Sequence, residues 1–224
     1  MNHTTDPTRA VLTNASRSTR TLREAILTLR LVPGARLVER ELVTQLGVSR
    51  TGVRAALQAL ESESLVVRGQ RGVFSVAAVS ADEARQIYEV RAALEPAMAR
   101  LFVQRATDTQ IAAPSAAVAQ AEAAARAVNG AAYVAAFRRF YAELLAGSGN
   151  DVAQRILQTL DARISYLRHL TTQRASLPRQ LRTVDLLRGI AGAVEAGKPD
   201  LAARRCAVFV ARSARFALDV LAET

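Results

Sequence analysis

Apolar residues recur at helical spacing along most of this chain, and residues typical of β-strands are confined to two short runs. These runs, Leu65–Val67 and Val73–Val76, flank a turn that contains Gly69 and Gly72. Helical segments precede this hairpin, and from Ser80 to Ala222 only helical periodicity is present. The pattern predicts a mainly α protein, in which a small domain with one hairpin is followed by an all-α helical bundle.

The composition narrows the class of protein. Half of the 224 residues are apolar, which is enough to bury a core in one large or two small domains. The formal net charge of +10 favours polyanionic partners, although charge alone does not distinguish DNA from a membrane surface. The single cysteine, Cys206, suits a reducing cytoplasm, where we expect the protein to be located. No apolar stretch long enough to span a membrane is present, and the polar N-terminus does not resemble a secretory signal.

Changes in composition predict three parts. We expect a flexible arm over residues 1–18, a small domain that contains the hairpin over 19–78, and an all-helical domain over 80–222. Three pairs of residues have the spacing of a helix-capping box, and each is expected to begin a helix: Thr21 with Glu24, Ser80 with Glu83, and Thr107 with Gln110.

The segment between the first helix and the hairpin has the clearest functional meaning. A short helix from about Glu39 to Leu46 is followed by Gly47, and Ser49 is placed to cap a helix that runs to about Glu63. In this second helix the apolar residues share one face, whereas two arginines lie on another. The apolar set is Val53, Ala56, Leu57 and Leu60, and the arginines are Arg50 and Arg54.

Three helices followed by a hairpin predict a winged helix-turn-helix, whose third helix enters the major groove of DNA. Arginine suits the exposed face of that helix because its guanidinium group reaches both guanine edges and phosphates. An arginine-rich helix face is more often simply solvated. The prediction therefore depends on the turn glycine, the cap, the arginines and the glycine-rich hairpin occurring in this order.

Residues 22–66, LREAILTLRLVPGARLVERELVTQLGVSRTGVRAALQALESESLV, resemble the DNA-binding domain of GntR-type bacterial transcription regulators. Residues 79–101, VSADEARQIYEVRAALEPAMARL, resemble the start of the FCD effector domain of their FadR-like branch. The resemblance implies a ligand-responsive regulator without enzyme activity, expected to be a repressor that binds a palindromic operator as a homodimer. By this resemblance, operator contacts would come from Arg40, Ser49, Arg50, Thr51, Arg54, Gln70, Arg71 and Gly72.

Two residues depart from the family pattern. Gly52 stands where proline is usual, and Ser64 stands where glycine is usual. Glycine inside a helix costs up to about 1 kcal/mol relative to alanine, so the start of the recognition helix is expected to be softer. Neither change removes a group that would contact DNA.

The resemblance also implies a central pocket, which in most FCD domains holds a metal ion with one Asp and three His. At the matching positions this chain has Phe137, Tyr141, Leu187 and Phe209. It has only two histidines, so a site with three cannot be built, and we expect no metal and no other cofactor. Packing of these apolar and aromatic side chains is expected to fill or reshape the pocket.

Without a metal ion, an arginine is the natural group to bind the carboxylate of an organic acid. Arg91 is one candidate, although its spacing from Glu95 equally predicts a surface salt bridge. An apolar effector is the other possibility. The expected effector-binding residues are Arg91, Tyr133, Phe137, Tyr141, Arg163, Tyr166, Leu187 and Phe209.

Two other functions remain open from the sequence. An architectural DNA-binding protein that needs no effector would have a filled pocket. An enzyme is not expected, because the chain lacks the nucleophile-elbow, zinc-protease and phosphate-loop motifs.

Overall fold

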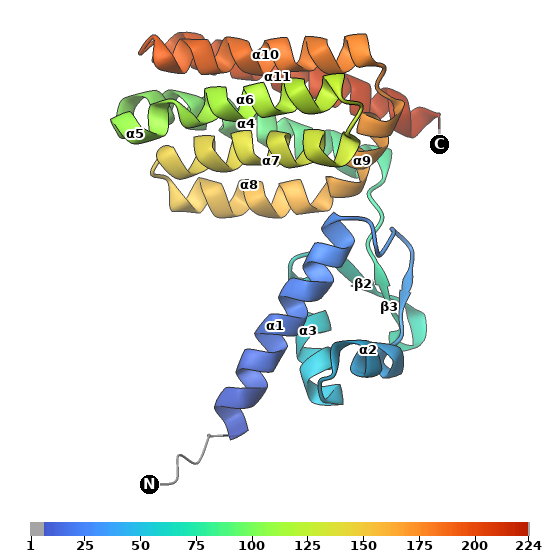
Figure 1. Cartoon of the computed structure of the whole chain (residues 1–224). Coiled ribbons are helices and arrows are strands. Elements are labelled where there is room, and N and C mark those ends of the chain that lie inside the picture. The colour runs from blue at the N-terminus through green and yellow to red at the C-terminus, as the bar shows by residue number, and fades with distance from the viewer. Residues whose placement is uncertain (1–6, 224) are drawn as a thin grey trace, which may run out of the picture. The chain divides into compact units, whose positions relative to one another are not determined.

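The computed structural model describes residues 7–223, without the side chains of residues 7–15, 71, 165 and 166. The chain divides into two compact units, Met1–Val79 and Ser80–Thr224 (Figure 1). Both units are built mainly from helices, which confirms the predicted fold class. Within the described residues, no helix has the length and apolar character needed to cross a membrane.

The first unit combines three helices with a small antiparallel sheet of order β1-β3-β2. In the sheet, Leu37 lies opposite Phe74, and Val66 lies opposite Val76. Leucines and valines of the helices close the core against this sheet, and Val53, Leu57 and Leu60 are completely buried. The elements are α1 (Pro7–Leu27), β1 (Arg36–Leu37), α2 (Glu39–Leu46), α3 (Arg50–Ser62), β2 (Val66–Arg68), η1 (Gln70–Gly72) and β3 (Phe74–Val76).

The first helix differs from its prediction. Helix α1 begins at Pro7, so residues 7–18 are helical where a flexible arm was expected, and residues 1–6 lie outside the described part. Thr21 is an interior residue of this helix, and its hydroxyl donates a hydrogen bond to the carbonyl oxygen of Arg17 at 3.1 Å. A hydroxyl bonded back to the preceding turn does not cap a helix, so the capping-box spacing was misleading here.

The second unit is a bundle of helices, and its core holds fully buried Phe102, Phe140, Leu144 and Ile190. Helices α4 and α11 pack against each other, and in Figure 1 α11 is seen behind α10 and α6 and α4 behind α6 and α7. Ser80 caps α4 as predicted, because its hydroxyl accepts a hydrogen bond from the Glu83 amide at 3.1 Å. The helices are α4 (Ala81–Arg105), α5 (Asp108–Ile111), α6 (Ala113–Arg126), α7 (Gly130–Gly147), α8 (Asp151–Arg163), α9 (Ser165–Arg174), α10 (Leu177–Glu195) and α11 (Pro199–Ala222).

Candidate nucleic-acid interface and ligand cavity

Helix α3 separates an inward apolar face from an outward polar face. Ala56, Leu57 and Leu60 have no exposed surface, whereas Arg50 and Thr51 are exposed at the start of the helix. The outward face therefore presents a guanidinium group and a hydroxyl at the helix end where backbone amides also lack partners within the helix. This arrangement can bind an anionic, hydrogen-bonding surface.

The turn before α3 fixes where that face begins. Gly47 ends α2 with φ of 63°, and its amide donates to the Val43 carbonyl at 3.0 Å. Ser49 is the N-terminal cap of α3, and its hydroxyl oxygen accepts from the Gly52 amide at 3.2 Å. This bond uses one lone pair of the Ser49 hydroxyl oxygen and leaves the hydroxyl hydrogen free to donate to another partner.

Arg54, one turn further along α3, is held by a partner that the sequence did not reveal. Its Nε donates to both carboxylate oxygens of Glu39 at 3.0 Å, and 67% of the Arg54 side chain remains exposed. Glu39 lies in the first turn of α2, beside the exposed Arg40. The ion pair joins the two helices and fixes the direction of the Arg54 side chain, although such an exposed pair adds little stability.

The hairpin turn is a short 3₁₀ helix between β2 and β3. Gly72 adopts φ of 76°, which favours glycine, and the Gly69 amide closes the turn by donating to the Val73 carbonyl at 2.8 Å. Gln70 and Gly72 are exposed, as expected for a wing, while the Arg71 side chain lies outside the described atoms. The guanidinium carbon of Arg68 lies 5.4 Å from the centre of the Phe74 ring.

The second unit contains a cavity of about 370 Å³ between helices α4, α7, α9, α10 and α11. Four of the expected pocket residues line it: Arg91, Tyr133, Phe137 and Phe209. The three aromatic rings are in contact along one wall, with ring centres 5.6 Å apart for Tyr133 and Phe137 and 5.7 Å apart for Phe137 and Phe209. Side-chain packing therefore shapes this space but leaves it open.

Three of the other expected pocket residues do not line the cavity. Tyr141 lies behind the aromatic wall, 6.3 Å from Phe137 and 5.9 Å from Phe209 between ring centres. Leu187 is completely buried in the core, and Arg163 forms an ion pair with Glu83. The prediction placed these residues by sequence spacing, which does not show how far each helix face turns from the cavity. The Tyr166 side chain lies outside the described atoms.

Arg91 forms both contacts that the sequence suggested as alternatives, since it lines the cavity and pairs with Glu95. The pair is buried rather than at the surface, with only 5% and 4% of the two side chains exposed and Nε 2.5 Å from Oε1. The guanidinium carbon also lies 4.8 Å from the centre of the Tyr88 ring. Burial is the largest single effect and lowers the pKa of Arg91, but the charges of Glu95, Tyr88 and Tyr141 and the hydrogen bond to Glu95 together outweigh it, so the pKa is raised well above its usual value.

Five further arginines line the cavity and were not predicted. Arg168, on α9, forms an ion pair with Asp161 at 2.5 Å. The other four have no ion pair within the described residues. They come in two pairs at i, i+3 spacing, Arg179 with Arg182 on α10 and Arg212 with Arg215 on α11. That spacing is visible in the sequence, but the meeting of the two pairs depends on how the helices pack.

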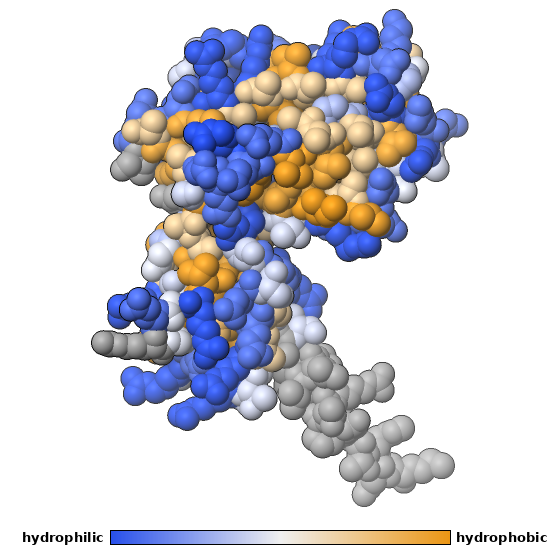
Figure 2. Space-filling model, turned by 180° about the vertical axis from the view of Figure 1, so that it is seen from behind, coloured by the Kyte–Doolittle hydropathy of each residue, from blue (hydrophilic) through white to orange (hydrophobic). Residues whose placement is uncertain are grey.

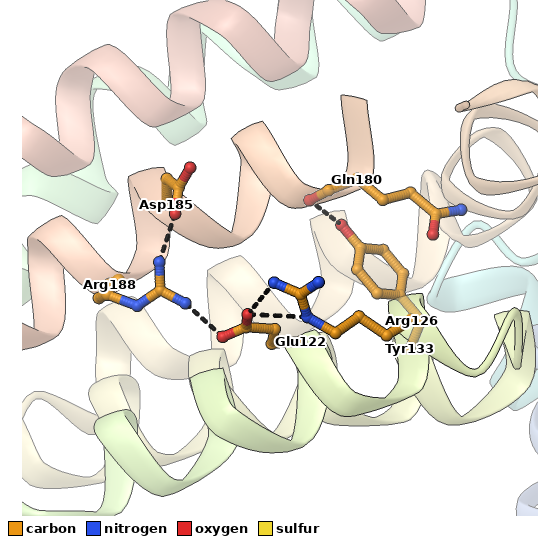
Figure 3. A network of polar contacts seen from close by, with 6 residues as sticks. All are labelled: Glu122, Arg126, Tyr133, Gln180, Asp185 and Arg188. Carbon is orange, nitrogen blue, oxygen red and sulfur yellow. Dashed lines mark hydrogen bonds and ion pairs between the residues drawn. The ribbon is translucent and has the colours of Figure 1, made fainter. Parts of the chain in front are cut away.

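Polar contacts hold α10 beside its neighbours (Figure 3). Glu122 of α6 accepts from Arg126 at 2.7 Å and pairs with Arg188 of α10 at 2.5 Å. The Tyr133 hydroxyl donates to the Gln180 carbonyl at 3.4 Å, which joins α7 to α10 at the cavity. These contacts position the helix that carries Arg179 and Arg182.

The residues at the four predicted metal-ligand positions do not fit a metal ion. Phe137, Leu187 and Phe209 offer no ligand atom, and the Tyr141 hydroxyl is buried without a hydrogen-bond partner. Within the described residues, no three His, Cys, Asp or Glu side chains lie close enough together to hold a metal. The chemistry of the cavity is that of cationic guanidinium groups beside aromatic rings.

A winged helix-turn-helix and an all-helical domain with a cationic cavity define a regulator class that combines a DNA-binding module with a ligand-binding module. Residues 15–76 match the family described as "Bacterial regulatory proteins, gntR family", and residues 86–212 match the FCD domain. The chain therefore belongs to the GntR family of bacterial regulators and carries an FCD domain.

Two curated relatives match part of the chain. The Nta operon transcriptional regulator of Aminobacter aminovorans is 42% identical over 80 residues, which are 36% of this chain and 38% of that protein. The uncharacterized HTH-type transcriptional regulator YdhC of Bacillus subtilis is 32% identical over 79 residues, 35% of each chain. The chain thus spans little more than a third of the length of these relatives. Their names describe regulators, not enzymes.

Two solved structures share the fold over nearly the whole chain. E. coli McbR/YncC superposes with a TM-score of 0.79 at 20% identity, covering 94% of this chain and 97% of that one. A putative GntR transcriptional regulator from Rhodococcus sp. RHA1 gives a TM-score of 0.78 at 22% identity, covering 92% and 98%. At these identities the likeness concerns the fold.

Proposed function

We propose that this protein is a cytoplasmic transcriptional repressor that binds a palindromic DNA operator as a homodimer and responds to a small organic acid. The observation that carries the proposal is the outward face of α3, where Arg50, Thr51 and Arg54 are exposed behind a capped helix start. Arginines at the start of such a helix reach base edges in the major groove, and Arg40 is placed to bind phosphate. Gln70, Arg71 and Gly72 of the wing would contact the adjacent backbone.

Binding as a dimer follows from the small size of the recognition helix. The 13 residues of α3 read only a few base pairs, so two half-sites are needed for specificity. Apolar side chains gather on the side of the second unit seen in Figure 2. In this unit α4 exposes 42% of Val90 and α11 exposes 47% of Val208, which suits contact with a second copy.

The open cavity favours an effector-responsive regulator over an architectural protein. Its volume of about 370 Å³ is within the range of small-molecule sites, and FCD domains bind small-molecule effectors. An anionic effector fits the arginines of its wall. The effector changes operator affinity if it binds two arrangements of the protein unequally.

The proposal is tested by operator binding. A duplex selected by the full-length protein from a random library is labelled, and its affinity is measured by fluorescence anisotropy at several salt concentrations. Arg50→Ala should weaken binding by roughly 1–3 kcal/mol and make it less salt-dependent, because a charge-assisted contact is lost. Arg155→Ala on α8 removes an equal charge far from α3 in sequence and should leave affinity unchanged. Equal behaviour of both variants would remove α3 from the interface.

A further inference from the structure

The cavity is lined by more positively charged arginines than there are carboxylates to neutralise them. Arg91 and Arg168 are each paired with a carboxylate, Glu95 and Asp161. The remaining arginines of the wall are Arg179, Arg182, Arg212 and Arg215, and Asp219 is the single acidic side chain among the described lining residues. Four guanidinium groups therefore share one space with little counter-charge.

The two helices present these arginines in a fixed way. The guanidinium carbon of Arg179 lies over the Phe216 ring, 3.4 Å from the ring centre. Stacking of this kind orients the plane of the guanidinium group and leaves its N–H groups for a partner in that plane. Burial lowers the pKa of Arg179, and the positive charge of Arg182 lowers it further, as expected where like charges are close.

Neutral donors contribute little to binding an anion here. The hydroxyls of Thr171 and Thr172 both donate to the Arg168 carbonyl, at 2.9 and 2.8 Å, and the Thr183 hydroxyl donates to the Arg179 carbonyl at 3.0 Å. Because each hydroxyl has one hydrogen, these three can only accept from a ligand. The cationic donors that an anion in this cavity meets are the arginines.

We propose that the effector is a small multivalent oxyanion, with at least two negative charges from phosphate or carboxylate groups, bound by Arg179, Arg182, Arg212 and Arg215. The inference rests on the proposed function, in which this cavity is the effector site. A monocarboxylate has two oxygens and one charge, so it satisfies one guanidinium fork and leaves the other cations repelling one another. Phe137 and Phe209 offer an apolar wall for the uncharged part of the ligand.

Binding is measured on the full-length protein by isothermal titration calorimetry at constant ionic strength. The probes are pyrophosphate, citrate and acetate. Pyrophosphate or citrate should bind with a saturable dissociation constant at least about tenfold below that of acetate, because more charge-assisted hydrogen bonds form. Binding of pyrophosphate alone assigns a phosphorylated ligand, and binding of citrate alone assigns a polycarboxylate. Absence of saturable binding by both, or acetate binding as tightly, would overturn the proposal.

Paired variants locate the binding site. Arg212→Gln with Arg215→Gln should weaken the tighter probe by at least about tenfold. Arg155→Gln with Arg204→Gln changes the net charge equally on exposed surface outside the cavity lining and should have no effect. Arg50→Gln with Arg54→Gln tests whether the probe binds α3 instead. An equal loss in either control pair would overturn the assignment to the cavity.

Two further measurements keep the result interpretable. Should the double cavity variant unfold, Arg212→Lys and Arg215→Lys keep the charge but lose the guanidinium fork, and each should still weaken binding. Operator affinity without any probe reports the proposed function separately. If the wild-type protein binds its operator but no anion, this inference alone is refuted. If the wild-type protein binds no operator, the proposed function is refuted.

Discussion

Arg91 and Glu95 form a buried ion pair, where the sequence alone indicated a surface contact. Their i, i+4 spacing was readable from the sequence, where it predicted a weak surface contact. Both side chains are buried, and the second oxygen of Glu95 has no hydrogen-bond partner within the described residues. The sequence could not reveal this, because burial depends on helices α7 and α11 covering α4.

Removing one member of this pair should be costly. Glu95→Ala leaves the Arg91 charge buried without its counter-ion, so the free energy of unfolding should fall by about 3–5 kcal/mol. The double variant Arg91→Met with Glu95→Leu removes both charges and should recover most of this loss. Urea unfolding followed by circular dichroism measures both. A double variant as unstable as the single variant would contradict the ion-pair explanation.

The buried Tyr133 hydroxyl should make the stability of the second unit depend on pH in the alkaline range. Burial raises the pKa of Tyr133 to about 12 from an ordinary value of 10.0, with opposing effects of Thr183 and Arg179. A folded-state pKa above the unfolded one means that the stabilising contribution is complete below pH 10 and is lost as the pH rises towards 12. The unfolding free energy of Tyr133→Phe should therefore fall less steeply over this range than that of the wild type. Parallel pH profiles would show that Tyr133 is not responsible.

Capping residues in the sequence correctly predicted where two helices begin, with Ser49 before α3 and Ser80 before α4. They failed at Thr21, where the same spacing occurs inside a helix. Ser64, which stands where the family usually has glycine, adopts φ of 56° just after α3. The departure from the family pattern therefore falls where a non-glycine residue is strained.

Two glycines inside helices should respond in opposite ways to alanine. At Gly52 a Cβ atom would lie 3.5 Å from the Ser49 hydroxyl oxygen, an ordinary contact. Gly52→Ala should therefore raise the unfolding free energy by about 0.5–1 kcal/mol through the lower entropy of the unfolded chain. Thermal unfolding measures this change, and a destabilised variant would show that α3 requires glycine at that position.

At Gly147, near the end of α7, the result should be the reverse. A Cβ atom there would overlap the ring of Phe102, which is completely buried in α4. Gly147→Ala should lower the unfolding free energy by about 1–3 kcal/mol because the core must shift to admit it. Urea unfolding that shows no loss would mean that the two helices have more space between them than the structure gives.

For the whole chain, the sequence predicted the fold class, the winged helix-turn-helix and the outward arginines of α3, because each depends on local periodicity and turn chemistry. The cavity was predicted less well. Its aromatic wall and Arg91 were anticipated, whereas Arg179, Arg182, Arg212 and Arg215 were not. Those four residues meet only because α10 packs against α11, and no pattern within either helix specifies that contact.

The proposed regulatory function depends above all on α3 as the element that contacts DNA bases. The crystal structure of the full-length protein bound to its selected operator duplex tests this most directly. We predict Arg50, Thr51 and Arg54 within hydrogen-bonding distance of base edges in the major groove, with Arg54 released from Glu39, in each half of a twofold complex. A complex in which these three side chains face solvent, while another surface contacts the duplex, would contradict it.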